Sequence, residues 1–367
     1  MKKITVTSPL LPPLEELTPY LEDIWSRKWL TNSGYYHQQL EYELCKYLDV
    51  PYISLFSNGT LALITALQAL ELKGEVITTP YSFVATSHAI KWNNLKPVFI
   101  DIDPNTFNID TNKIEEAITA NTCAILPVHV YGNPCDHDAI QAIADKHNLK
   151  VIYDAAHAFG VRKNGQSILN MGDLSILSFH ATKTYSTIEG GAIVCDSLEM
   201  KEKLDHLKNF GFESEAEIST CGMNSKLNEV QAAFGLASLK YISDAIKKRE
   251  KVAEHYYERL KNISGITAFE VESHIDFNYS YFPILIDEST FGVSRDRLFE
   301  ELKENNVLAR RYFFPLITDF SAYKDYNKGK FVHSEKISKS VICLPIHHEI
   351  THNQVKEIVR IIQECRK

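Results

Sequence analysis

The sequence has no apolar run long enough to cross a membrane, and its N-terminal stretch is too polar for a signal peptide. Cysteine is scarce and scattered: there are seven among 367 residues, an odd number, with no Cys-x-x-Cys pair. Such a set gives no disulfide framework and fits a reducing compartment. These absences predict a cytoplasmic protein without a membrane partner.

Blocks of like charge, internal repeats and low-complexity segments are also missing. Basic and acidic residues are interspersed, and 39 of the first against 47 of the second give a net charge of −8. A charge of this sign favours solubility and argues against nucleic acid as the main partner. The hydrophobic content of 44% is ample for a packed core, and the length suggests about two domains.

From residue 52 onward, short β-rich runs alternate with helical patterns. The predicted strands cover residues 52–56, 75–79, 96–102, 123–129, 150–153 and 174–179, and another begins at Ala192. The predicted helices cover residues 14–29, 37–48, 61–70, 83–92, 112–119 and 137–147. This alternation predicts an α/β fold with a mainly parallel sheet flanked by helices. In such sheets, functional sites collect at the carboxyl ends of the strands.

The pattern changes in the last third of the chain. It continues with a charged helical stretch at 228–260, a strand at 282–286, a helix at 294–305, a strand at 341–344 and a last helix from Thr351. We therefore expect a large domain over residues 1–240 and a smaller α+β domain over residues 241–367.

Lys183 and Asp154 each follow a predicted strand. Lys183 lies in a polar turn that ends at Gly190-Gly191, and Asp154 comes directly after Tyr153. Taken alone, each has an ordinary explanation, as a solvated lysine and as a carboxylate that caps or pairs at a strand end. Together they supply what a pyridoxal phosphate site requires. The amine forms a Schiff base with the cofactor aldehyde, and the carboxylate keeps the pyridine nitrogen protonated.

The segment Ser57-Asn-Gly-Thr60 follows a strand and opens a helix. Glycine lets the backbone approach a phosphate, which the free N–H groups at the helix start and the Thr60 hydroxyl would bind. An ordinary capped strand-to-helix turn is the simpler explanation for so short a motif. Ser178 adds a second hydroxyl beside Lys183. Phe83 could cover one face of the pyridine ring, although plain core packing explains it equally well.

Four segments taken together resemble a known family. They are Ser57-Asn-Gly-Thr60, Asp154-Ala-Ala-His-Ala-Phe-Gly160, Ser178-Phe-His-Ala-Thr-Lys183 and Glu189-Gly-Gly-Ala192. In combination they are similar to the sugar aminotransferases of the DegT/DnrJ/EryC1/StrS family, and the similarity extends from Trp29 to His347. The resemblance implies the type I fold of pyridoxal-phosphate-dependent aminotransferases.

The resemblance also implies roles for single residues. Lys183 matches the Schiff-base lysine and Asp154 the partner of the pyridinium nitrogen. The other matches are Gly59, Thr60 and Ser178 at the phosphate, Phe83 on the ring, and His157, near the cofactor hydroxyl, where many members have glutamine.

One match points to a second subunit. Asn224, in Gly222-Met-Asn224, matches an asparagine that reaches the cofactor phosphate of a neighbouring subunit. The resemblance therefore implies a homodimer with shared active sites. The family's tyrosine-arginine after this asparagine is Ser225-Lys226 here, so the other contacts of the loop stay open.

Lysine at position 183 also separates two chemistries, because dehydratases of this family carry histidine there. Lys183 favours amino transfer. The resemblance implies a dTDP-linked keto-deoxysugar as the acceptor, with L-glutamate as the donor. The freed lysine would act as the general base at the donor α-carbon and return the proton to the sugar. The sequence leaves open the nucleotide and the choice between a 3-keto and a 4-keto sugar. The resemblance places such an enzyme in O-antigen synthesis.

Arg310 and Tyr312 are candidates for binding the sugar nucleotide. An arginine fork and a tyrosine hydroxyl suit a pyrophosphate, and Tyr312 also matches the family in wording. Surface arginines that flank a buried aromatic run explain the same letters about equally well.

Two other classes of protein compete with this interpretation. His348-Glu-Ile-Thr-His352 spells the zincin pattern, but Thr351 and Gln354 form a capping box that would start the helix at Thr351 and leave His348 outside it. We therefore expect no metal site. A regulator with an aminotransferase-like domain would carry an added DNA-binding module, and the chain has no basic N-terminal extension to house one.

Overall fold

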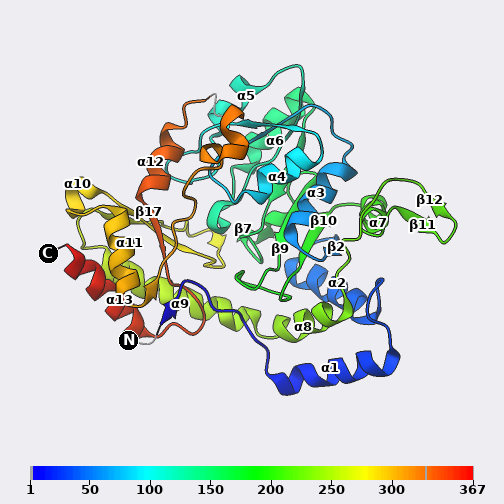
Figure 1. Ribbon diagram of the computed structural model, residues 1–367, viewed down its shortest axis with the longest axis horizontal. Helices are drawn as coiled ribbons and strands as arrows, with labels where there is room; N and C mark the ends of the chain where they lie inside the picture. The colour runs from blue at the N-terminus through cyan, green and yellow to red at the C-terminus, as the bar shows by residue number, and fades with distance from the viewer. Residues whose placement is uncertain (1–2, 327–328, 367) are drawn as a thin grey trace.

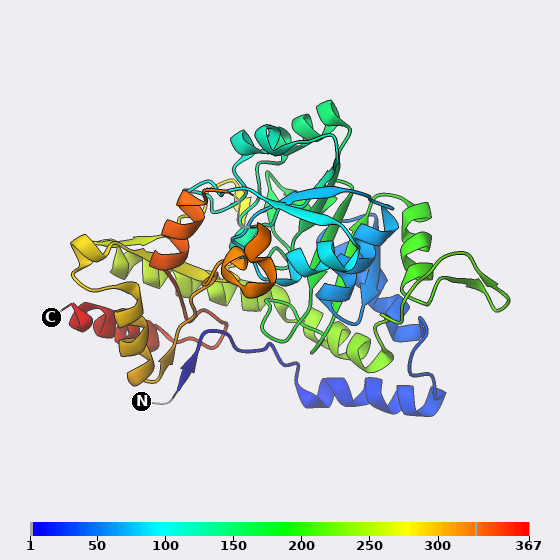
Figure 2. The same ribbon diagram turned by 45° about the horizontal axis from the view of Figure 1, so that its top comes forward.

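The computed structural model describes residues 3–326 and 329–366. Its centre is a seven-stranded sheet with the strand order β2-β10-β9-β6-β5-β3-β4, flanked by helices (Figure 1; Figure 2). The strands are β2 (Tyr52–Phe56), β3 (Glu75–Thr78), β4 (Lys96–Phe99), β5 (Thr122–Ile125), β6 (Lys150–Asp154), β9 (Leu174–Ser178) and β10 (Gly191–Cys195). Within this sheet β10 runs antiparallel to β2 and β9, and the other pairs are parallel. The expected α/β fold with a mainly parallel sheet is confirmed.

Successive side chains of β10 enter two different hydrophobic layers, because neighbouring residues of a strand point to opposite faces. Ala192 and Val194 pack in the layer that α2 (Tyr35–Leu48) closes, and Ile193 and Cys195 pack in the layer that α3 (Gly59–Ala69) and α7 (Leu198–Leu207) close. Both faces of the sheet are therefore buried. This explains why the central strands read as continuous apolar runs rather than as alternating ones.

Most predicted elements lie where the pattern placed them. The strands at 52–56, 282–286 and 341–344 and the helix at 137–147 agree to the residue. The remaining helices that flank the sheet are α1 (Leu14–Arg27), α4 (Ala85–Trp92), α5 (Ile114–Ala117), α6 (His137–His147) and α8 (Glu229–Leu239).

Four predicted elements differ clearly from the structure. The strand expected at 96–102 ends at Phe99, and the helix expected at 112–119 is reduced to α5 after a 3-10 turn at Thr111–Lys113. The strand expected at 123–129 ends at Ile125, because Pro127 has no N–H for the ladder and the chain then turns through the 3-10 segment Val130–Gly132. The helical stretch expected at 228–260 is broken, so that α8 ends at Leu239 and α9 (Ile242–Leu260) follows after a turn.

The last third of the chain builds a second, antiparallel sheet in the order β13-β15-β17. Its hydrophobic side packs under α9, α11 and α13. The elements here are β13 (Ile266–Ala268), β15 (Phe282–Ile286), α10 (Glu288–Phe291), α11 (Arg295–Glu304), β16 (Val307–Leu308), α12 (Val332–Ser340), β17 (Val341–Leu344) and α13 (His352–Cys365).

The N-terminal segment returns to this second part of the molecule. β1 (Ile4–Thr5) pairs in parallel with β16, and Ile4 is buried in the same hydrophobic cluster as α13. The division into domains at residue 240 stays a prediction.

Short strands complete the structure: β7 (Arg162–Lys163), β8 (Gln166–Ser167), β11 (Phe212–Ser214), β12 (Glu217–Ile218) and β14 (Ile275–Asp276). None of the helices in the described part of the chain is long and apolar enough to span a bilayer.

Candidate active site

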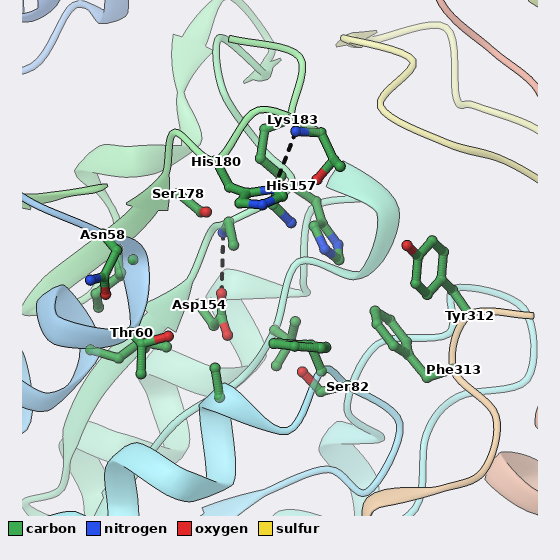
Figure 3. A pocket seen from close by; sticks show the side chains of 18 of the residues that line it. Asn58, Thr60, Ser82, Asp154, His157, Ser178, His180, Lys183, Tyr312 and Phe313 are labelled. Carbon is green, nitrogen blue, oxygen red and sulfur yellow. Dashed lines mark hydrogen bonds between the residues drawn. The ribbon is translucent and has the colours of Figure 1, made fainter. Parts of the chain in front are cut away.

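A cavity of about 730 Å³ opens at the carboxyl ends of β2, β3, β6 and β9. Figure 3 shows Asn58, Thr60 and Ser178 at one end of it, with Tyr312 and Phe313 at the other. Eight of the predicted residues line this cavity: Gly59, Thr60, Phe83, Asp154, His157, Ser178, Lys183 and Tyr312. The structure brings these eight residues together, because parallel strands release their following turns at one edge of the sheet.

Lys183 lies in a loop that is closed by backbone hydrogen bonds within the loop. The Lys183 N–H donates to the His180 carbonyl at 2.9 Å, and the Phe179 and Thr187 amides donate to Gly190 and Phe179 at 2.8 and 3.0 Å. Burial lowers the pKa of the Lys183 amine to about 8, against a smaller opposing effect of Asp154. A larger fraction of this amine is therefore uncharged near neutral pH than of a solvated lysine, as a nucleophile or base requires.

Asp154 ends β6 and is buried in the cavity floor. Its carboxylate accepts hydrogen bonds from the Thr86 hydroxyl at 2.7 Å and from the Ala156 N–H at 3.1 Å. Burial raises the pKa of Asp154, although both hydrogen bonds and the nearby charge of Lys183 oppose the shift. A buried carboxylate that faces a cavity is stabilised by a cationic partner. The protonated nitrogen of a pyridine ring is such a partner, so Asp154 fits pyridoxal phosphate.

The other end of the cavity is shaped for an anion. Asn58 caps α3 by accepting the Leu61 N–H at 2.9 Å, which leaves the first amides of the helix without partners inside it. A Cβ at Gly59 would lie 3.0 Å from the Ser178 Cβ, so glycine lets the turn rest against β9. The Thr60 and Ser178 hydroxyls line the same space. Amides, hydroxyls and a helix N-terminus together fit a phosphate group.

His157 is buried beside this floor as a neutral donor. Its Nδ1 accepts the Tyr131 N–H at 3.2 Å, which places the ring proton on Nε2. Burial, with further contributions from Lys183 and His129, lowers the pKa of His157 well below its usual range. The ring also stacks on Phe313, with centroids 5.8 Å apart. His157 can therefore donate a hydrogen bond into the cavity without carrying charge.

Phe83 lines the cavity and is 60% exposed. An aromatic ring that served only the hydrophobic core would be buried. The exposure of Phe83 therefore favours a ring that contacts a ligand, rather than one that only fills the core.

Asn224 and Arg310 lie outside the lining of this cavity. The Asn224 side chain is exposed and its Oδ1 accepts from the Lys226 ammonium at 2.8 Å. Its predicted contact with a neighbouring subunit stays a prediction. Arg310 is exposed next to Tyr312, whereas Arg311 is held by Asp296 at 2.7 Å.

The sequence interpretation missed several residues of the cavity. His180 lies in the segment Ser178–Lys183 and Glu189 begins the segment Glu189–Ala192, and their polarity was the available signal. Thr86 stands three residues after Phe83, on the face of α4 that meets Asp154. Tyr281 and Phe313 come from distant segments and had no local signal.

The zincin-like letters do not lie on one helix. The capping box of Thr351 and Gln354 is present, α13 begins at His352, and His348 precedes the helix, as expected. The His352 ring packs on His255, with centroids 4.2 Å apart. Within residues 3–326 and 329–366, no group of three His, Cys, Asp or Glu side chains is placed to hold a metal ion.

Comparison with known proteins agrees with a cavity that fits pyridoxal phosphate, because it identifies a family of aminotransferases. The model of the DegT/DnrJ/EryC1/StrS aminotransferase family matches residues 14–363. The chain is 56% identical to the dTDP-4-amino-4,6-dideoxy-D-glucose transaminase of Shigella dysenteriae, over 100% of both chains. It is 50% identical to the Escherichia coli protein of the same name, over 98% of both.

Solved structures agree over the whole chain. The crystal structure of DesI with its TDP-sugar product superimposes with a TM-score of 0.96 at 32% identity, over 100% of this chain and 93% of that one. Helicobacter pylori PseC, an aminotransferase of pseudoaminic acid biosynthesis, gives a TM-score of 0.92 at 28% identity, over 99% of both chains.

Proposed function

Because the chain belongs to the DegT/DnrJ/EryC1/StrS aminotransferase family, we propose that it transfers the amino group of L-glutamate to dTDP-4-dehydro-6-deoxy-D-glucose. The product would be dTDP-4-amino-4,6-dideoxy-D-glucose, a precursor for O-antigen or another polysaccharide. The observation that carries this choice is the 56% identity, over the full length, to a transaminase named for this product. A relative named for a 3-amino sugar and one named for a GDP sugar reach only 33% and 32%.

Each part of pyridoxal 5′-phosphate would be bound by different residues of the cavity. When bound, the cofactor supplies an aldehyde that reacts with amines and a ring that takes up electrons. Lys183 would face the aldehyde, Asp154 would hold the ring nitrogen protonated, and His157 would donate to the ring hydroxyl. Gly59, Thr60 and Ser178 would bind the phosphate, and Phe83 would cover the ring.

Lys183 carries the proton in this scheme. Its amine accepts the proton of the glutamate α-carbon and later delivers a proton to the sugar carbon that receives the nitrogen. The lowered pKa of about 8 suits both directions, because the charged amine is only about tenfold more populated than the neutral amine at pH 7. The buried side chains of His157 and Phe313 exclude water from their side of the cavity.

Arg310 and Tyr312 form the acceptor side of the site. Tyr312 lines the cavity at the end opposite the phosphate turn, and Arg310 is exposed next to it. Within the described residues the Arg310 guanidinium has no ion pair, so it is available to a pyrophosphate, whereas Arg311 is held by Asp296. Asn224 would complete the phosphate site of a partner subunit, so the active form would be a homodimer.

Two measurements test this proposal. The purified enzyme is supplied with glutamate and a panel of dTDP-, UDP- and GDP-linked 3-keto and 4-keto sugars, and the product is identified by NMR. Amination at carbon 4 of the dTDP sugar is expected, and preferred amination at carbon 3 would replace the proposal by its nearest alternative. Borohydride reduction of the holoenzyme should fix the cofactor to the peptide that contains Lys183. Attachment to another peptide would contradict the assignment.

A further inference from the structure

Tyr312 and Phe313 form a wall at the end of the cavity proposed for the acceptor (Figure 3). Two buried tyrosines, Tyr81 and Tyr131, hydrogen-bond to this wall. The Tyr81 hydroxyl donates to the Tyr312 carbonyl oxygen at 3.0 Å, and the Tyr131 hydroxyl donates to the same oxygen. The two hydroxyl oxygens are themselves 2.5 Å apart. Tyr81 follows β3 and Tyr131 follows β5, so the pair ties the Tyr312 loop to the central sheet.

The count of hydrogens in this cluster gives it a testable property. Two hydroxyl hydrogens serve the three oxygen–oxygen contacts, and the buried Cys343 thiol also contacts the Tyr131 hydroxyl. Either tyrosine alone can still donate to the Tyr312 carbonyl. Removal of both leaves the part-buried Tyr312 carbonyl without either side-chain donor, and the loss of the last donor costs more than the weakening of one of two hydrogen bonds. The two hydroxyls should therefore act as substitutes for each other, and their loss should be strongly non-additive.

Tyr131 also reaches the cofactor side of the cavity. Its N–H donates to the His157 Nδ1 at 3.2 Å, and its backbone is left-handed, with a φ of 60°, which is rare for a bulky residue. The Phe313 ring is stacked on both neighbours, at 6.1 Å from Tyr131 and 5.8 Å from His157. The contact with His157 uses the backbone of Tyr131, whereas the contact with Tyr312 uses its hydroxyl. A change to phenylalanine separates the two.

We propose that Tyr81 and Tyr131 are positioning residues that fix Tyr312 for the acceptor sugar nucleotide, and that their hydroxyls set the affinity for this substrate but not for the cofactor. This inference rests on the proposed function, which assigns Tyr312 to the acceptor side. A merely structural role would lower stability without separating the two ligands.

The test compares Tyr81→Phe, Tyr131→Phe and the double variant with the wild-type holoenzyme. Tyr256→Phe is the matched control, because the buried Tyr256 hydroxyl also donates to a backbone carbonyl, that of Pro345 at 3.0 Å, in the second hydrophobic core. Four quantities are measured: the KM for the sugar nucleotide, the KM for glutamate, the dissociation constant of the cofactor, and the melting temperature. Hydrogen exchange of the peptide 310–316 is followed in the holoenzyme without sugar.

Each single variant should raise the KM for the sugar nucleotide by less than about threefold, and the double variant by more than about tenfold. Exchange in the peptide 310–316 should accelerate by about tenfold in the double variant alone. The KM for glutamate and the cofactor affinity should stay within about twofold of wild type. Tyr256→Phe should lower the melting temperature without these effects.

Three results would overturn the inference: additive single effects, an equal loss of cofactor affinity, or the same change of KM in Tyr256→Phe. Failure of the proposed function would look different, because the wild type itself would not aminate the dTDP sugar. The exchange measurement would then still decide whether the two hydroxyls fix the Tyr312 loop.

Discussion

Gly191, the first residue of β10, lies directly against the turn that opens α3: a Cβ at Gly191 would stand 2.6 Å from the Gly59 nitrogen. No side chain fits there without moving the turn. Gly191→Ala should therefore displace the Gly59 amide and weaken cofactor binding by about tenfold, equivalent to about 1.4 kcal/mol, as measured by absorbance titration of the apoenzyme. Gly165→Ala, in the β7–β8 turn, is the control: its Cβ would meet open space, but its φ of 78° strains an alanine, so this variant should lower stability without weakening cofactor binding. An unchanged dissociation constant in Gly191→Ala would show that the turn does not hold the phosphate.

The lowered pKa of Lys183 predicts how cofactor capture depends on pH. Burial holds the pKa at about 8, so the neutral amine that attacks the aldehyde accumulates as the pH rises through this value. The rate at which the apoenzyme captures pyridoxal phosphate, followed by stopped-flow absorbance, should rise with a midpoint near 8. A midpoint near 10 would mean that Lys183 behaves as a solvated lysine. Lys183→Gln should abolish both the covalent capture and turnover.

Arg310 predicts a separation of the two substrates. Its exposed guanidinium has no ion pair in the described part of the chain, so Arg310→Gln should leave the fold intact and raise the KM for the dTDP sugar by about tenfold. The KM for glutamate should not change. Arg297→Gln, which loses only an exposed i,i+4 pair with Glu301, is the matched control. Equal kinetics of the two variants would remove Arg310 from the acceptor site.

Asp101 predicts a loss of stability in acid. Burial acts to raise its pKa, but hydrogen bonds from the Ser334 hydroxyl and from the His333, Ser334 and Ile102 amides outweigh burial and leave the pKa lowered. A carboxylate with a lowered pKa stabilises the fold above its unfolded pKa of about 3.9 and loses that contribution as the pH falls through the lower folded value. Asp101→Ala should therefore reduce the free energy of unfolding at pH 7 by about 2 kcal/mol and flatten the acid branch of the stability curve.

The control for Asp101 is Asp276→Ala, an exposed aspartate in β14. Urea denaturation between pH 3 and pH 7 measures both variants. A parallel pH dependence of Asp101→Ala and the wild type would show that these hydrogen bonds do not carry the acid sensitivity.

The structure of the zincin-like segment, His348–His352, predicts that turnover does not depend on zinc. His348 precedes α13, so it does not share a helical face with His352. Treatment with a strong zinc chelator, and the change His348→Ala, should each leave turnover within about twofold. Stoichiometric zinc whose removal abolishes turnover would contradict this expectation.

Local chemistry was enough to predict much of this molecule. Apolar runs bounded by polar turns located the strands, because turns and helix starts depend on neighbours in the chain. For the same reason, glycine and hydroxyl residues after β2 and at the end of β9 marked the end of the cavity proposed for the phosphate. Lys183 and Asp154 could be singled out since each follows its own strand. The family resemblance joined them into one site before any distance was known.

Tertiary structure decided the rest, because the contacts involved join residues that are far apart in the sequence. Thr86 meets the Asp154 carboxylate across 68 positions, and Tyr81 and Tyr131 meet the Tyr312 carbonyl across 231 and 181. The pKa of Lys183 and the neutral state of His157 arise from burial, which no local pattern specifies. The sequence therefore determined which groups are available for the proposed chemistry. The packing of distant loops decided the protonation of these groups and built the wall at the end of the cavity proposed for the acceptor.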